Sequence, residues 1–124
     1  MVTVRSFSTD PESIQLLRSL SRQGVTAEGA VRAYQGLYPL AKGMTNIGML
    51  ATRHRALSFQ GGAMRIWGLY SGLQVDREIS SVKRTEIEVS PSGGKYVRLR
   101  TASGRKLWID RSWVPAIAAW QSTA

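Results

Sequence analysis

The C-terminal third of the chain contains two short runs in which apolar and polar residues alternate. Val97 and Leu99 alternate with arginines in the first run, and Leu107 and Ile109 flank a tryptophan in the second. Alternation with a period of two is typical of a β-strand that buries one face. An Ala-Ser-Gly segment separates the two runs. The pattern therefore predicts an antiparallel β-hairpin over residues 96–110.

The length of the hairpin loop determines which side chains share a face. A two-residue loop would place Leu99 opposite Trp108 and would mix apolar and charged side chains on both faces. A three-residue loop, with Gly104 in the left-handed conformation, places Leu99 opposite Leu107 and gathers the apolar residues on one face. We therefore predict the three-residue loop.

The outer face of this predicted hairpin is basic. The register places Arg98 opposite Trp108 and Arg100 opposite Lys106. Like charges directly across a β-ladder destabilise it by up to about 1 kcal/mol. A surface that binds an anion would tolerate such a pair, and long side chains that extend into solvent are the alternative explanation.

The segment between residue 44 and the hairpin also favours β-structure. Alternating patterns over 55–59 and 84–89 predict strands, and a Gly-Gly pair at 61–62 predicts a turn between strands. After Asp110 the apolar spacing becomes helical, with Ser112 as a cap, Pro115 in the first turn and Trp120 on the apolar face. We expect six or seven strands followed by a helix.

The first forty residues are predicted to form two helices. Asp10 is an N-cap residue followed by proline, and Gly24 supplies a left-handed stop. Thr26 caps a second helix, which Pro39 ends. Because helices this short are not stable alone, we expect the pair to pack on the β-domain. Docking or oligomerisation through residues 11–38 is the alternative.

These patterns together predict an α+β fold in two parts. Residues 1–41 form a helical hairpin, and residues 42–124 form an antiparallel bent sheet or split barrel with a C-terminal helix that caps it.

Net charge indicates what kind of partner the protein has. The formal charge is +9, and residues 83–111 hold eight Lys and Arg against three Asp and Glu. A compact basic surface is therefore expected on one part of the fold, and a solvated face without a ligand is the alternative.

Composition excludes several classes of function. The chain has no Cys and one His, which excludes disulfide frameworks, cysteine catalysis and metal sites with two imidazoles. The single imidazole, His54, lies between Arg53 and Arg55, and neither a nucleophile elbow nor a phosphate loop is present. No apolar run is long enough for a membrane span. We expect a cytoplasmic protein that is not an enzyme and has neither cofactor nor metal.

Two stretches carry a resemblance to known families. Residues 17–28, a leucine helix followed by Gly24-Val25-Thr26, resemble the short helical SHOCT module. Residues 48–59, Ile79-Ser80-Ser81-Val82 and Ser103-Gly104-Arg105 resemble the early hairpin, the fourth-strand entry and the last turn of pleckstrin-homology-like (PH) and GRAM domains. Trp120 falls where the capping helix of those domains plugs the barrel, and the resemblance covers about residues 42–121.

The PH/GRAM resemblance implies a binding function, because these domains recognise anionic lipid headgroups, peptides or proteins. We expect an adaptor module that contacts an anionic membrane surface or a protein partner. A nucleic-acid-binding protein that uses Trp108 and Tyr96 for stacking is one alternative. A small phage or mobile-element protein that inhibits a host complex is another. The candidate anion-binding residues are Lys83, Arg84, Lys95, Arg98, Arg100, Arg105, Lys106 and Trp108.

Overall fold

The structure is a computed structural model that describes residues 4–36, 53–90 and 94–123. Its helices and strands are α1 (Pro11–Arg22), β1 (Gly29–Gln35), β2 (Arg53–Gln60), β3 (Ala63–Tyr70), β4 (Gln74–Lys83), β5 (Ile87–Ser90), β6 (Tyr96–Thr101), β7 (Lys106–Asp110) and α3 (Val114–Ser122). Short 3₁₀ turns connect some of them: η1 (Ser71–Leu73), η2 (Arg84–Glu86) and η3 (Arg111–Trp113).

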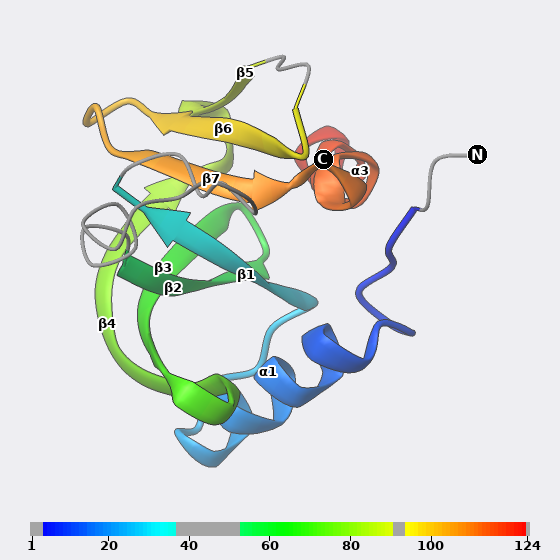
Figure 1. Ribbon diagram of the computed structural model, residues 1–124, viewed down its shortest axis with the longest axis vertical. Coiled ribbons are helices and arrows are strands. Elements are labelled where there is room, and N and C mark those ends of the chain that lie inside the picture. The colour runs from blue at the N-terminus through cyan, green and yellow to red at the C-terminus, as the bar shows by residue number, and fades with distance from the viewer. Residues whose placement is uncertain (1–3, 37–52, 91–93, 124) are drawn as a thin grey trace.

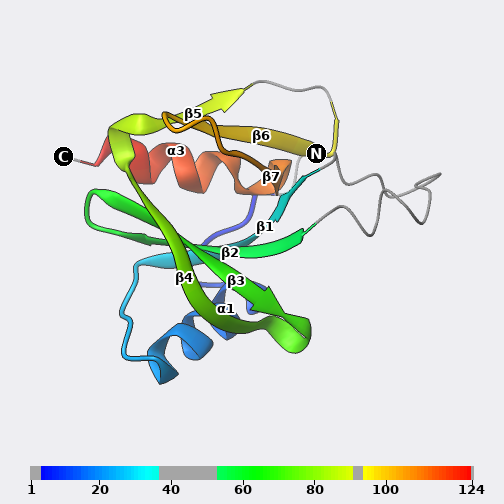
Figure 2. The same cartoon turned by 90° about the vertical axis from the view of Figure 1, so that its left-hand side faces the viewer.

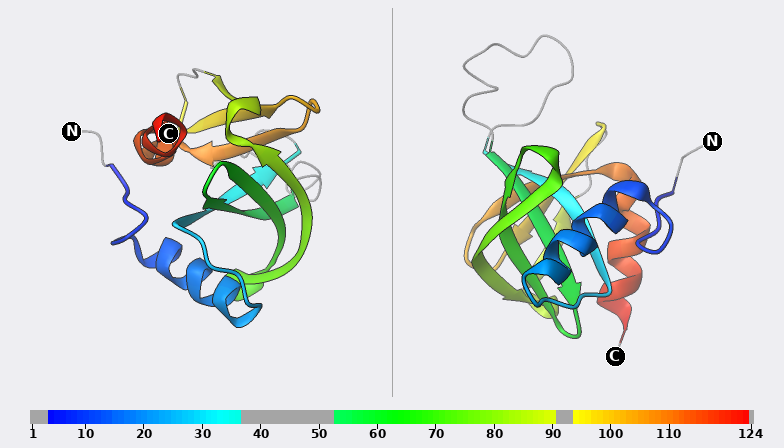
Figure 3. Two further views of the ribbon diagram at one scale, coloured as in Figure 1. Left: turned by 180° about the vertical axis from the view of Figure 1, so that it is seen from behind. Right: turned by 90° about the horizontal axis from the view of Figure 1, so that it is seen from below.

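The strands form one open antiparallel sheet in the order β4-β3-β2-β1-β7-β6-β5. The sheet bends so strongly that β5, β6 and β7 face the concave side of β1 to β4 (Figures 1 and 2). Helix α3 closes one opening between the two halves, and α1 lies across the convex side (Figures 2 and 3). The α+β class, the bent antiparallel sheet and the C-terminal helix are as the sequence predicts.

The sheet has a hydrophobic core on each of its two faces. The main core fills the concave side, where Leu57, Leu99 and Ile117 are fully buried. The second core lies on the convex side, where Leu16 and Leu20 of α1 pack against the sheet. The middle of β2 and the first half of β1 are therefore buried on both faces.

The predicted N-terminal helical hairpin is wrong. One helix, α1, is present, and the expected second helix is replaced by strand β1. The apolar residues of this segment suit either a helix or a strand that is buried on both faces, so local spacing does not distinguish them. Pairing with β2 on one side and β7 on the other decides for the strand. The expected helix end at Pro39 lies outside the described residues.

Helix α1 begins where the sequence predicts. The Asp10 side chain accepts a hydrogen bond from the Ser13 backbone N–H at 3.0 Å, and Pro11 occupies the first turn. Gly24 has the predicted left-handed backbone, with a φ of 79°. The helix packs its apolar face on the convex side of the sheet, so α1 covers the β-structure, as expected of the N-terminal helices.

The β6–β7 hairpin has the predicted register. Leu99 pairs with Leu107 and Val97 with Ile109, and Gly104 adopts a φ of 88°. The expected strand at 84–89 is shorter, because residues 84–86 form η2 and β5 starts at Ile87. The Asp110 side chain, rather than that of Ser112, accepts the capping hydrogen bond at η3, from the Ser112 N–H at 2.9 Å.

The N-terminal segment completes the main core. The Phe7 ring stacks on Phe59 at 5.3 Å and on Trp113 at 5.6 Å. A Cβ atom at Gly29 would lie 2.2 Å from Phe7 Cγ, so only glycine lets the ring pass over β1. Among the helices of the described ranges, none combines the length and apolar character needed to cross a bilayer.

Candidate anion-binding surface

The outer face of the β6–β7 hairpin carries four of the predicted site residues. Arg98 lies opposite Trp108, and Arg100 lies opposite Lys106. Their apolar neighbours in sequence point into the main core, so the alternation of the strands turns all four side chains outward. Glu88 on β5 lies opposite Arg100 across the next ladder, so an acidic residue borders this face.

Strands β1 and β2 extend this face with two residues that the sequence interpretation missed. Tyr34 lies opposite Trp108, and His54 lies opposite Tyr34 on the other side. The Tyr34 ring meets the His54 ring edge-on at 5.2 Å and the Tyr96 ring at 5.5 Å. We call His54, Tyr34, Trp108 and Arg98 the outer row. Tyr34 was assigned to a helix, so its place beside Trp108 could not be expected.

A second group of basic residues lies at the concave side, where β1 ends. The Arg55 Nε donates to Gln35 Oε1 at 2.9 Å, and an Arg105 Nη1 approaches the same oxygen at 3.4 Å. The β6–β7 turn, which carries Arg105, and the C-terminal end of β1 lie on the same side of the molecule, at the left in Figure 1. We call Gln35, Arg55, Arg105 and the adjacent Arg53 the arginine cluster.

In the part of the chain that the structure describes, the arginine cluster has no acidic ion-pair partner. Among the described residues no carboxylate forms an ion pair with Arg55 or Arg105, and the buried Nε of Arg105 has no hydrogen-bond partner. Burial lowers the pKa of Arg55, and the charges of Arg53 and Arg105 lower it further. Two guanidinium groups thus share a neutral amide oxygen as their acceptor.

The sequence explains why this region lacks acidic partners. Residues 29–75 and 89–109 contain no Asp or Glu, and each segment contains five Lys and Arg. The sheet order brings the two segments together, because β1 and β2 of the first lie beside β7 and β6 of the second. The outer row and the arginine cluster both come from these acid-free segments. Within these two segments an anion meets only basic and neutral side chains, and Asp110 at the end of β7, opposite Tyr96, is the first acidic residue after the second of them.

Three predicted site residues have other surroundings. Arg84 lies beside the β2–β3 turn, at the other end of β2 from Arg53, and donates to the Trp120 carbonyl at 3.3 Å. Lys83 is exposed at the end of β4. The Lys95 ammonium lies 5.5 Å from the centre of the Tyr96 ring, at the start of β6. Lys95 is therefore next to the outer row, whereas Lys83 and Arg84 belong to a different corner.

His54 lies in an electropositive, partly buried environment. Burial lowers the pKa of His54, and the positive charge of Arg32 lowers it further, so the imidazole is neutral at pH 7. No hydroxyl nucleophile of the described residues forms a hydrogen bond with it. Within the same residues, no three His, Asp or Glu side chains converge on a metal position.

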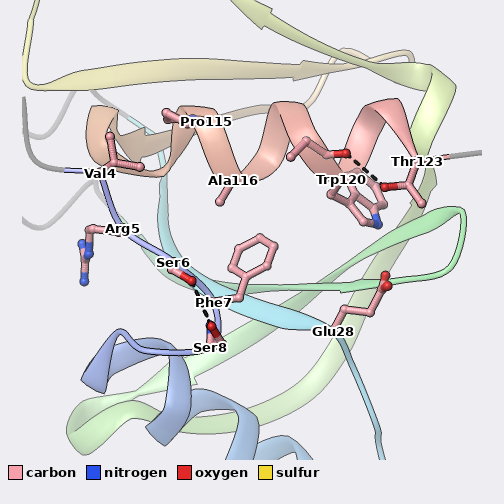
Figure 4. Close-up of a pocket in the computed structure, with 11 residues that line it drawn as sticks. Val4, Arg5, Ser6, Phe7, Ser8, Glu28, Pro115, Ala116, Trp120 and Thr123 are labelled. Carbon is pink, nitrogen blue, oxygen red and sulfur yellow. Dashed lines mark hydrogen bonds between the residues drawn. The ribbon is translucent and has the colours of Figure 1, made fainter.

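A larger groove lies elsewhere, between the N-terminal segment and α3. It has a volume of about 510 Å³, and its walls include Phe7, Ala116, Ala119 and Trp120 (Figure 4). Its lining is mainly apolar, with the Arg5 guanidinium at one end and Glu28 at the other. Because Phe7 and Trp120 also belong to the packing around the main core, we regard this groove as a result of how the N-terminal segment packs.

Comparison with known proteins adds no relative. No protein-family model matches the chain, and no curated protein matches it.

Proposed function

We propose that the protein is a non-enzymatic binding module of the PH/GRAM type that contacts an anionic membrane surface through its basic β-face, by which we mean the outer face of the β6–β7 hairpin together with the arginine cluster at its turn. The observation that carries this proposal is the meeting of two acid-free segments at adjacent strands, with Arg55 and Arg105 left without a carboxylate among the described residues. Arginine suits phosphate groups because its planar guanidinium offers paired donors.

The architecture supports the comparison with PH and GRAM domains. A strongly bent antiparallel sheet, closed at one opening by a C-terminal helix, is the arrangement that the resemblance implies. Trp120 packs from α3 against Phe59 with ring centres 4.9 Å apart, and this contact supports the comparison. Fold alone does not establish function, so the proposal depends on the charge arrangement.

Vesicle binding tests the proposal. We expect the wild-type protein to co-sediment with phosphatidylglycerol vesicles, and Arg98→Glu/Arg100→Glu to weaken this at least tenfold, because each basic residue near an anionic surface contributes about 1 kcal/mol. Arg18→Glu/Arg22→Glu is the matched control, since both arginines are exposed on α1 and the net charge changes equally. If the two variants sediment equally with the vesicles, contact with a membrane through this face is refuted. A protein partner is then the remaining form of the proposal.

One observation favours a nucleic-acid-binding alternative. Three aromatic rings, those of Tyr34, Tyr96 and Trp108, gather beside Arg98 on one sheet face. Aromatic and basic side chains on a sheet can stack bases and hold phosphates of a single strand. Binding of a single-stranded oligonucleotide across a salt series decides this alternative, because several phosphate contacts produce a steep loss of affinity with salt. No binding at low salt would exclude it.

A further inference from the structure

A small pocket lies directly beside the outer row, on the convex side of the sheet. It has a volume of about 290 Å³, and it is bounded by Arg32 of β1, His54 of β2 and the β3–β4 turn, residues 69–73. The pocket is distinct from the arginine cluster, which faces the concave side. His54 links the two, because its backbone carbonyl accepts a hydrogen bond from Arg55 at 3.2 Å.

The turn that forms one wall of this pocket is held in an unusual conformation. Gly72 has a φ of 74°, and Leu73, which is not a glycine, has a φ of 59°. Left-handed backbone at a leucine is uncommon and persists only where the surroundings enforce it. Helix α1 supplies that restraint, because Gln15 donates to the Gly72 carbonyl at 3.2 Å and Ser19 accepts from the Val75 N–H at 2.8 Å. The wall is therefore fixed before any ligand arrives.

The charge of this pocket depends on His54. Arg32 forms an ion pair with Glu12 of α1 at 3.1 Å, so its positive charge is already balanced. The turn, Leu-Tyr-Ser-Gly-Leu, contributes no charged side chain. When His54 is neutral, the net charge of the groups around the pocket is close to zero. When His54 is protonated, the pocket gains one positive charge.

The titratable and charged groups of the described residues around His54 include no carboxylate that binds the imidazole. Arg32 and the Tyr34 phenol face it from β1, the Tyr70 phenol belongs to the turn, and Arg53 and Arg55 flank it on its own strand. The carboxylate that Arg32 binds is Glu12, which also lies 3.6 Å from Arg5. No described carboxylate forms an ion pair with His54 itself.

We propose that this pocket is a second anion subsite that binds the oxyanion of a phosphate group when His54 is protonated. The protonated imidazole and the Arg32 guanidinium would hold the oxyanion from two strands, against the fixed turn. Binding and protonation are then linked, so a bound anion raises the pKa of His54 and acid strengthens binding. This inference deepens the proposed function, since it makes the anion affinity of the basic face depend on pH.

The direction of the pH dependence follows from where His54 titrates. In the free protein its pKa lies below 6.5, because burial and Arg32 disfavour the charged form. A bound anion favours the charged form, so the complex takes up a proton as pH falls through this range. Affinity therefore rises on acidification, by at most tenfold per pH unit for one proton.

Inorganic sulfate is the probe, because its charge does not change across this pH range, and the NMR signals of the His54 ring report binding in the pocket separately from binding at the arginine cluster. The chain has one histidine, so its ring signals in an NMR titration belong to His54. We expect sulfate to raise the pKa of His54 and to bind about fivefold more tightly at pH 5.5 than at pH 7.5. His54→Gln should bind with the weaker affinity at both pH values, and His54→Lys with the tighter affinity at both.

Three outcomes would overturn the inference. They are a His54 pKa that sulfate leaves unchanged, a pH dependence that persists in His54→Gln, and a His54→Lys variant that binds no better than His54→Gln. His54 is more exposed than buried, so we expect both variants to unfold at the same urea concentration as the wild type. Urea unfolding therefore serves as the check that the variants are folded.

Vesicles distinguish a lipid phosphate from free phosphate as the source of the oxyanion. With phosphatidylglycerol vesicles, whose phosphodiester charge is also constant, we expect wild-type binding to rise on acidification and His54→Gln binding to stay flat. A sulfate effect without vesicle binding at any pH would refute the proposed membrane function and support the pocket as a site for soluble phosphate. Vesicle binding that is equal at both pH values would refute the pocket as a lipid subsite and leave the proposed function intact.

Discussion

Two regions of the molecule use arginine in opposite ways. Around the start of α1, Arg5 binds Asp10 through two hydrogen bonds of 2.8 and 3.0 Å, and Arg32 pairs with Glu12. At the end of β1, Arg55 and Arg105 share a neutral amide oxygen. Arginines of the first region connect the N-terminal segment, α1 and β1, whereas those of the second repel each other.

This difference distinguishes arginines that stabilise the folded state from arginines that do not. A paired, partly buried arginine contributes to stability through charge-assisted hydrogen bonds. An arginine beside another arginine opposes folding slightly, so its presence calls for another explanation, which the proposed anion binding supplies. The following predictions test this division, because the first region should respond to mutation in stability and the second in binding.

The largest effect on stability is expected from Asp10→Ala. This substitution removes the N-cap of α1 and the bidentate partner of Arg5, so we expect the free energy of unfolding to fall by about 2–3 kcal/mol. Urea unfolding at pH 7 measures the change. A loss below about 0.5 kcal/mol would mean that the paired region is not a structural clamp.

The same carboxylate should make the protein sensitive to acid. Burial alone would raise the pKa of Asp10, but hydrogen bonds from Arg5 and the Ser13 N–H outweigh it and hold the pKa below 3.8. Because the folded state favours the charged form, its stabilising effect is present above the ordinary pKa and is lost as pH falls through the lowered value. Asp10→Asn should show a smaller loss of stability than the wild type between pH 5 and pH 2.5.

The arginine cluster should respond to anions instead. At pH 7.5, where His54 is neutral, saturating sulfate should stabilise the wild type by about 1–2 kcal/mol relative to chloride at matched ionic strength. The effect should disappear in Arg55→Gln/Arg105→Gln and persist in Arg18→Gln/Arg22→Gln. Thermal unfolding in the two salts measures this. Equal sulfate stabilisation of both variants would show that the cluster has no special affinity.

The outer face of the β6–β7 hairpin could be predicted from sequence, because it depends on strand alternation. The pattern around Leu99 and Leu107 determines the hairpin register, and the register determines that Arg98 and Trp108 share a face. Such local patterns survive folding because one face of the hairpin must be buried.

The contribution of β1 could not be predicted in the same way. Ala30, Val31 and Ala33 suit a helix as well as a strand, and what decides is pairing with β7, more than seventy residues later in the chain. The arginine cluster depends on that pairing, because Gln35 meets Arg105 only through it. Long-range pairing therefore determined the part of the candidate site that sequence reasoning missed.

Arg84, which lies outside both regions, also tests whether an arginine acts in stability or in binding. The Arg84 guanidinium lies 5.7 Å from the centre of the Trp120 ring and donates a hydrogen bond to the Trp120 carbonyl. This corner of the molecule is at the opposite end of β2 from the arginine cluster. We expect Arg84→Ala to lower stability by about 0.5–1 kcal/mol and to leave vesicle binding within twofold of the wild type. A tenfold loss of vesicle binding in this variant would extend the anion-binding surface to η2, as the sequence suggested.

The smallest stability change, and the sharpest contrast with Asp10, is expected at Arg105. Arg105→Gln keeps a polar side chain but removes one of two like charges beside Gln35. Relief of repulsion offsets the loss of a weak 3.4 Å contact, so in dilute chloride the free energy of unfolding should change by less than about 0.5 kcal/mol. Sulfate binding should nevertheless fall. A destabilisation comparable to that of Asp10→Ala would mean that Arg105 is a structural residue, and the distinction between paired and unpaired arginines would then fail where it matters most.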